Sequence, residues 1–213
     1  MAHRISVQEP GGPEVLRYEA YDPPPPGPGE ALVRHDAIGL NFIDVYFRTG
    51  LYPAPQRPFT PGMEGAGVVE AVGPGVSDLE PGQRVAYAGS PIGAYADRRT
   101  MPAEKLVPLP DSIPSETAAA MMLKGMTAQY LLRQTYKVQP GDTVLFHAAA
   151  GGVGLIFGQW AKHLGATVIG TVGSPEKAEL ANAHGYDHVI DYKREDFVAK
   201  VKEITGGKGV PVV

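Results

Sequence analysis

Residues 143–154, TVLFHAAAGGVG, constrain this chain more than any other stretch. The segment begins with an apolar, β-branched run and passes into a turn of small residues that ends at Gly154. Apolar residues then recur at helical spacing, at Trp160, Ala161 and Leu164. This order predicts a strand, a tight turn and a helix, which is the context in which a glycine-rich turn binds the pyrophosphate of a dinucleotide.

The turn departs from the G-x-G-x-x-G fingerprint at one position. Ala149 stands in place of the first glycine, whereas Gly151 and Gly154 occupy the other two positions. Backbone N–H groups of such a turn can approach a pyrophosphate, and the positive end of the following helix offsets its charge. Turns of small residues also serve as packing devices, so the glycines alone leave both interpretations open. The flanking strand and helix favour the nucleotide site.

Composition excludes several classes of function. The 213 residues can form one large domain or two small ones, and a net charge of −4 gives no electrostatic basis for binding nucleic acid or an anionic membrane. The absence of cysteine excludes disulfides, thiolate metal sites and a cysteine nucleophile. No apolar run reaches the ~18 residues of a membrane span, and the first ten residues lack a signal-peptide core. We therefore expect a cytoplasmic protein with neither nucleic-acid nor membrane partners.

The first half of the chain predicts a β-rich domain. Residues 5–7 and 15–18 flank the turn sequence PGGP and predict a hairpin, and the PPPPGPG stretch at 23–29 predicts a rigid extended connector. Short strands separated by Gly and Pro favour a compact, partly closed β-barrel. Further strands are expected at 31–40, at 64–72 and from residue 85.

The character of the sequence changes near residue 112. Residues 115–133 are rich in Ala and Leu and predict a helix that is interrupted at Gly125. Alternating strands and helices follow, and this alternation predicts a right-handed parallel sheet and hence an α/β fold. The expected strands are 143–146, 167–169, 188–190 and 209–213, and the expected helices follow Gly154, Ser174-Pro175 and residue 196.

The end of the second predicted strand indicates which coenzyme is bound. NAD-binding folds place an acidic residue roughly 20 positions after the glycine turn, but Gly170–Ser174 contains no Asp or Glu. Ser174 and Lys177 offer a hydroxyl and an ammonium group at a helix N-terminus, and both suit a 2′-phosphate. Lys177 could instead be a solvated surface lysine, and Glu176 is expected to point elsewhere on the helix. The pattern predicts NADP(H) rather than NAD(H).

Several separated motifs match a known family in the right order. GLNFIDVYFRTGLY at 39–52, PGMEGAGVVEAVG at 61–73 and LKGMTAQYLL at 123–132 accompany HAAAGGVG and IGTVGSPEK. Together they resemble the zinc-independent NADPH:quinone oxidoreductases, the zeta-crystallin-like group of the medium-chain dehydrogenase/reductase family. The resemblance implies a GroES-like catalytic domain at 1–124 and an incomplete Rossmann domain at 125–213. It also implies that the chain is C-terminally truncated and that the full-length form is a homodimer.

The resemblance further implies that no metal is bound. Zinc-dependent relatives carry a catalytic cysteine in a G-x-C-x-x-D segment, where this chain has Asn41, and a histidine in G-H-E, where it has Met63. Without a Lewis acid an alcohol cannot readily be ionised. Hydride addition to a conjugated acceptor needs no such step, because the resulting anion is delocalised.

Positions carried over from the family give the expected site residues. Tyr52 is expected to be the catalytic residue, as a hydrogen-bond donor to a substrate carbonyl, although the tyrosines could instead only pack the cleft. The substrate side is expected to comprise Asn41, Tyr46 and Tyr52. The coenzyme is expected to contact Phe42, Ile43, Asp44, Val45, Tyr46 and Tyr130 at its nicotinamide half, Gly152 and Val153 at its pyrophosphate, and Gly173, Ser174, Lys177 and Tyr192 at its adenosine phosphate.

Two hypotheses of function follow. The first is an NADPH-dependent reductase that transfers hydride to a quinone or a similar conjugated carbonyl without zinc. The alternative is a truncated, catalytically inactive fragment that retains partial coenzyme-binding features; it is motivated by Pro211, which would remove a donor from the last expected strand. An RNA-binding role, as suggested for some zeta-crystallin relatives, has little support in an acidic chain without a basic stripe.

Overall fold

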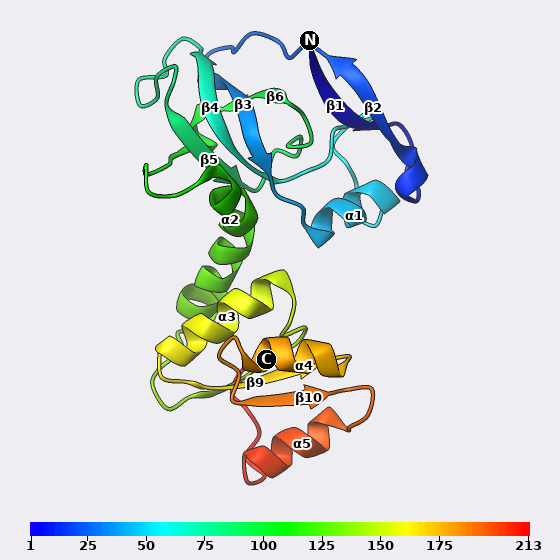
Figure 1. Cartoon of the computed structure of the whole chain (residues 1–213), viewed down its shortest axis with the longest axis vertical. Helices are drawn as coiled ribbons and strands as arrows, with labels where there is room; N and C mark the ends of the chain where they lie inside the picture. Colours follow the sequence, from blue (N-terminus) through cyan, green and yellow to red (C-terminus); the bar gives the residue numbers. More distant parts are fainter. The chain divides into compact units, whose positions relative to one another are not determined.

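The computed structural model describes all residues 1–213, which form two compact units, Met1–Leu123 and Lys124–Val213 (Figure 1). None of the helices combines the length and the apolar character that a bilayer span requires.

The first unit opens with a hairpin. Strand β1 (Ala2–Val7) pairs antiparallel with β2 (Leu16–Tyr21), so that Ala2 lies opposite Tyr21 and Val7 opposite Leu16. The short 3-10 helix η1 (Pro13–Val15) lies in the connection, where Pro13 supplies the fixed φ of a first helical position. The hairpin predicted from the turn sequence is confirmed.

A five-stranded antiparallel sheet forms the body of this unit, in the order β6-β3-β4-β5-β7. Its core is built from alternate residues of neighbouring strands, among them Val33, Val69 and Val85, all of them fully buried. The strands predicted at 31–40, at 64–72 and from residue 85 are confirmed. The strands are β3 (Glu30–Ile38), β4 (Glu64–Val72), β5 (Arg84–Ala88), β6 (Arg98–Pro102) and β7 (Val107–Pro108), with helices α1 (Phe42–Thr49) and η2 (Ala103–Lys105) in the connections.

The helix α2 (Ser115–Tyr130) runs through Gly125 without a break and continues into a π-helical turn, η3 (Leu131–Thr135). The predicted interruption at Gly125 is wrong. A glycine inside a helix costs only about 1 kcal/mol relative to alanine. Burial of Ala118, Ala128 and Leu132 in the cores outweighs that cost.

The second unit is a three-stranded parallel sheet in the order β10-β9-β8, with helices on both faces (Figure 1). Alternate residues of β8 face opposite sides: Val144 belongs to the cluster that α3 covers, and Leu145 to the cluster that α5 covers. This alternation of strands and helices is the predicted α/β arrangement, a partial Rossmann-like sheet. Its elements are β8 (Thr143–Phe146), α3 (Gly152–His163), β9 (Thr167–Val172), α4 (Pro175–Asn182), β10 (His188–Asp191) and α5 (Phe197–Ile204).

The strand predicted at 209–213 does not form. The carbonyl of Val212 accepts one hydrogen bond from the N–H of Leu145, at 3.2 Å, so the segment lies beside β8. No ladder develops, because Pro211 has no N–H to donate and Gly209 adopts a positive φ of 74°. The parallel sheet therefore has three strands rather than the predicted four.

Candidate functional site

The glycine-rich turn of the second unit is sterically constrained at two positions. Ala148 adopts a left-handed φ of 55°, and its carbonyl accepts a 2.8 Å hydrogen bond from the N–H of Gly151. At Gly154, a Cβ would lie 2.4 Å from the carbonyl oxygen of Ala149, so only glycine allows α3 to approach the end of β8 this closely. The turn therefore has the close strand-to-helix packing that the third glycine of a dinucleotide fingerprint provides.

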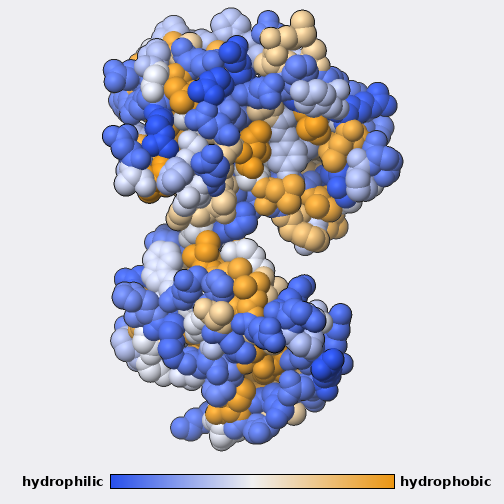
Figure 2. Space-filling model, viewed as in Figure 1, coloured by the Kyte–Doolittle hydropathy of each residue, from blue (hydrophilic) through white to orange (hydrophobic).

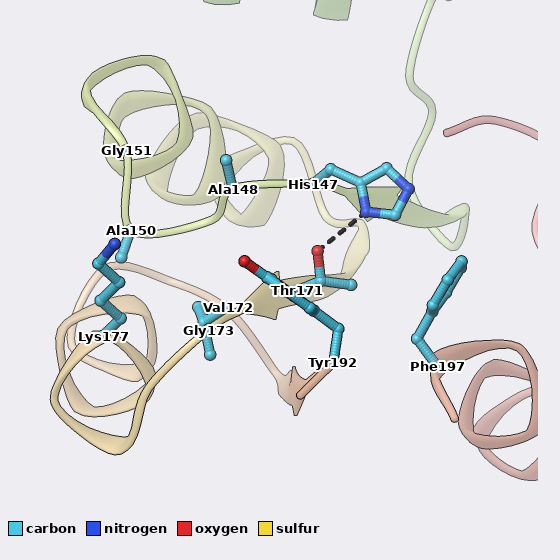
Figure 3. Close-up of a pocket in the computed structure, with 10 residues that line it drawn as sticks. All are labelled: His147, Ala148, Ala150, Gly151, Thr171, Val172, Gly173, Lys177, Tyr192 and Phe197. Carbon is cyan, nitrogen blue, oxygen red and sulfur yellow. Dashed lines mark hydrogen bonds between the residues drawn. The ribbon is translucent and has the colours of Figure 1, made fainter. Parts of the chain in front are cut away.

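A pocket of about 380 Å³ opens at the carboxyl ends of β8 and β9 (Figure 3). Ligands of open parallel α/β sheets bind at this edge. No Asp or Glu is among the lining residues, and Lys177 carries the one fixed charge. The lining residues are His147, Ala148, Ala150, Gly151, Thr171, Val172, Gly173, Lys177, Tyr192 and Phe197.

One end of this pocket is cationic. Ser174 caps α4, and its Oγ accepts a hydrogen bond from the backbone N–H of Lys177 at 3.4 Å. The Lys177 side chain extends from α4 towards Ala150 in the glycine-rich turn (Figure 3). A negative group at this end would meet both an ammonium group and a helix N-terminus.

The Glu176 carboxylate lies beside the N-cap of α4, outside the residues that line the pocket. Hydrogen bonds from its own backbone N–H and then from the Ser174 hydroxyl hold its pKa below the ordinary value, with a smaller contribution from the charge of Arg194. Glu176 is not among the residues that line the pocket; its carboxylate turns back to the N-cap of α4 instead. The first helical turn is short enough for a residue at its second position to reach back to the N-cap side chain.

Tyr192 crosses the middle of the pocket. A Cβ on Gly173 would lie 2.7 Å from the Tyr192 hydroxyl oxygen, so the missing side chain at Gly173 leaves room for the phenol. The hydroxyl points into the space between Lys177 and His147 (Figure 3). Tyr192 itself is half exposed, so its hydroxyl can reach a ligand in the pocket.

The other end of the pocket is formed by residues that the sequence did not predict. His147 Nδ1 lies 2.9 Å from Thr171 Oγ1, and its ring meets Phe197 edge to face at 5.4 Å between centroids. His147 follows β8 directly and Thr171 lies near the end of β9. Their positions at the carboxyl edge of a parallel sheet are a sequence signal that could have identified them.

In the first unit, Asn41 is buried and is hydrogen-bonded within the protein. It caps α1, and its Nδ2 donates to Glu64 Oε2 at 2.7 Å, while the N–H of Leu123 donates to Glu64 Oε1 at 2.8 Å. Gly39 has no room for a Cβ, which would lie 2.1 Å from the carbonyl oxygen of Ala119. The GLN segment and the GME segment of the sequence are therefore locked to each other through one buried carboxylate.

Asp44 has a comparable structural role. Its Oδ2 accepts hydrogen bonds from the backbone N–H of Asn41 at 2.9 Å and from the hydroxyl of Tyr95 at 2.8 Å. Burial and then the charge of Asp44 raise the pKa of Tyr95. The carboxylate of Asp44 thus fixes the start of α1 rather than pointing freely to solvent.

The aromatic residues of α1 form one cluster with the segment that follows the helix. Tyr46 lies 5.3 Å from Phe42 and 5.2 Å from Tyr52 between ring centroids, and Tyr52 also meets Phe47. Phe42 and Tyr52 are exposed, and apolar residues gather on the surface around α1 (Figure 2). This cluster offers a partly polar aromatic surface to a ring-shaped ligand.

The predicted site residues thus fall into separate places. Tyr46 and Tyr52 come together in the first unit, whereas Asn41 is buried against Glu64 at the start of α1; Ile43 and Val45 are half-buried on that helix. Gly173, Lys177 and Tyr192 come together in the second. Four predicted coenzyme contacts of the second unit lie outside the pocket lining: Gly152 and Val153 begin α3, Ser174 caps α4, and Tyr130 is exposed at the end of α2.

Comparison with known proteins accounts for both units. Residues 27–111 match the model of the alcohol dehydrogenase GroES-like domain, and residues 152–213 match that of the zinc-binding dehydrogenase family. The chain is 59% identical over 213 residues to a quinone oxidoreductase of Pseudomonas aeruginosa, covering all of this chain and 66% of that one. The chain belongs to the quinone oxidoreductase group of the medium-chain dehydrogenase/reductase family.

Two further relatives bear on the chemistry of this group. The crystal structure of Escherichia coli quinone oxidoreductase complexed with NADPH superposes with a TM-score of 0.97 at 52% identity, covering 99% of this chain and 65% of that one. A 2-haloacrylate reductase of a Burkholderia species is 52% identical, covering 97% of this chain and 64% of that protein. The chain thus spans 64–66% of the length of these relatives. In family terms it comprises a GroES-like β-rich domain followed by a partial Rossmann parallel sheet.

Proposed function

We propose that this chain belongs to an oxidoreductase that transfers hydride from NADPH to a quinone or a similar conjugated carbonyl, without zinc. The observation that carries the proposal is the pocket at the carboxyl edge of β8 and β9. Lys177 lies at one end of it, no acidic residue lines it, and a constrained glycine-rich turn forms its wall.

The residues around this pocket suit the adenosine end of NADPH. Lys177 would pair with a 2′-phosphate, and the Ser174 hydroxyl and the Tyr192 hydroxyl would donate hydrogen bonds to it. NAD would find no carboxylate here to accept a bond from its ribose hydroxyl. Gly152 and Val153, at the start of α3, would present backbone N–H groups to the pyrophosphate. The Escherichia coli relative was crystallised with NADPH, which agrees with this assignment.

The residues of the first unit suit a flat acceptor. NADPH, when bound, supplies the hydride. Tyr46, Tyr52 and Asn41 would then contact the substrate, with the Tyr52 hydroxyl donating a hydrogen bond to its carbonyl oxygen, where negative charge develops. Phe42, Ile43, Asp44, Val45 and Tyr130 would border the nicotinamide. Asn41 can contact the substrate only through those groups of its amide that are not bonded to Glu64, because its Nδ2 already donates a hydrogen bond to that carboxylate.

The donor set supports the proposal of metal-independent chemistry. Met63, at the position of a histidine ligand in zinc-dependent relatives, is buried, and no group of three or more His, Asp or Glu side chains is arranged to hold a metal ion. A conjugated acceptor needs no Lewis acid, and the reduction of a haloacrylate by one relative is chemistry of this kind.

The test is a quinone reduction assay with NADPH, run with and without a chelator. The proposal expects turnover that depends on NADPH and is unchanged by the chelator. Substituting Tyr52→Phe should lower kcat more than it raises KM, because the bond to the carbonyl oxygen strengthens as charge develops. Activity that disappears with the chelator and returns with zinc would contradict the proposal. Coenzyme binding without turnover would instead support the alternative of a chain that retains only coenzyme-binding features. A cytoplasmic location and a homodimer of the full-length form stay predictions.

A further inference from the structure

The first unit contains a buried cation that no carboxylate neutralises. Arg99 on β6 is only 6% exposed and takes part in no ion pair. Its guanidinium donates three hydrogen bonds, all to uncharged oxygens: to the Tyr87 hydroxyl at 3.3 Å, and to the carbonyls of Pro91 and Ile92 at 3.1 and 3.3 Å. Buried charges in proteins are ordinarily paired, so this arrangement leaves a positive potential inside the unit.

Arg99 lines a pocket of about 290 Å³, which we call the Arg99 pocket. Its walls come from the hairpin β1–β2, from the segment before β4 and from the segment before β6. They include Arg4, Tyr21, Phe59, Thr60, Ile92 and Arg99. No Asp or Glu lines it, although the whole chain is acidic. Glu19, from outside the lining, neutralises Arg4 through a 2.8 Å ion pair, so the charge of Arg99 is the uncompensated one.

We propose that the Arg99 pocket binds a small organic monocarboxylate. Its carboxylate would pair with Arg99, and its apolar body would lie against Phe59 and Ile92. A carboxylate suits the planar guanidinium, and a single negative charge balances the single uncompensated positive one. The Phe59, Ile92 and proline walls favour an organic body over a hydrated inorganic ion, which would have to lose its water against apolar surface. The pocket lies within the first unit and shares no residue with the coenzyme pocket, so this proposal does not depend on the proposed function.

The test compares benzoate with benzamide, which has the same shape and no charge. Binding is measured by calorimetric titration of the purified chain and by the thermal unfolding midpoint, which a ligand of the folded state raises. We expect one saturable benzoate site. Benzamide should bind at least roughly tenfold more weakly, the effect of losing one charge-assisted interaction. Equal binding of the two compounds, or no benzoate binding at millimolar concentrations, would overturn the proposal.

Substitutions then locate the site. Arg99→Lys keeps the charge but cannot keep all three bonds, and Ile92→Trp fills the pocket without changing any charge. Each should weaken benzoate at least roughly tenfold. Arg98→Lys is the matched control, because Arg98 is the neighbouring residue on β6, is exposed and pairs with Glu70 instead; benzoate binding should not change. Unchanged binding in both Arg99→Lys and Ile92→Trp, or competition by chloride and phosphate as effective as that by benzoate, would reject the site or its ligand class.

Discussion

Acidification should destabilise the first unit through His35. The His35 ring lies within a partly buried chain of hydrogen bonds: Arg99 donates to the Tyr87 hydroxyl, and that hydroxyl donates onward to His35 Nε2 at 2.8 Å. The Nδ1–H of His35 then donates to the carbonyl of Ala96 at 2.6 Å. Every group in the chain is satisfied only when His35 is neutral, because a proton on Nε2 would compete with the one that Tyr87 donates.

The magnitude follows from the pKa of His35. Burial lowers this pKa from its ordinary value of 6.5 to about 4; the charge of Arg99 adds to the decrease, and the Ala96 carbonyl, Asp36 and Asp97 oppose it. The unfolded chain takes up the proton below pH 6.5, whereas the folded unit takes it up only near pH 4. Stability is therefore fully present above pH 6.5 and is lost as the pH falls towards 4. At about 1.4 kcal/mol for each pKa unit, the loss reaches up to about 3 kcal/mol.

The assay is urea unfolding followed by circular dichroism between pH 7 and pH 4. The variant His35→Gln has no proton to gain, and His163→Gln, which replaces an exposed histidine of the second unit, serves as control. The difference in unfolding free energy between the wild type and His35→Gln should shrink by up to about 3 kcal/mol on acidification. The control should follow the wild type at every pH. A constant difference between the wild type and His35→Gln across this range would refute the reasoning.

Three further predictions test the packing and the electrostatics of the two units. Gly154→Ala should destabilise the second unit by roughly 1–3 kcal/mol in urea unfolding followed by Trp160 fluorescence, because the new Cβ meets the Ala149 carbonyl. Gly152→Ala should cost less, because its Cβ meets only the flexible Lys124 side chain, and equal costs for the two variants would contradict the account. Asn41→Leu should destabilise the first unit by roughly 1–3 kcal/mol in urea, because Glu64 loses a buried donor, and a neutral effect would show that this bond is dispensable. Glu176→Gln should favour NADPH over NADH in a binding titration by up to roughly fivefold, because it removes a competing anion from Ser174; a shift towards NADH would contradict this.

Much of the fold could be predicted from the sequence, because local patterns specify it. Alternating apolar residues and turn signals predicted the hairpin and the main strands of the first unit, and Ser174-Pro175 marked the start of α4 where the structure has it. The failures have two causes, one of longer range and one local. Burial around α2 overrides the glycine at 125, and Pro211 prevents a ladder beside β8 although the flanking valines favour a strand.

The candidate site was less predictable than the fold. Family motifs identified Gly173, Lys177 and Tyr192, which the fold brings to one pocket. No local pattern links His147 to Thr171, because the two are 24 residues apart and meet only when β8 and β9 pair. The bond between Asn41 and Glu64 is likewise formed by the fold of the first unit, and it changes how much of Asn41 remains for a substrate.

The central claim, that the second unit selects NADPH through Lys177, is tested most directly by titrating NADPH and NADH into the wild type and Lys177→Glu. Lys137→Glu, the same charge change outside the pocket lining, is the control. The account predicts that Lys177→Glu weakens NADPH by roughly 1.5–3 kcal/mol and leaves NADH nearly unchanged, while Lys137→Glu alters neither ratio. Equal losses for the two coenzymes in Lys177→Glu would contradict it.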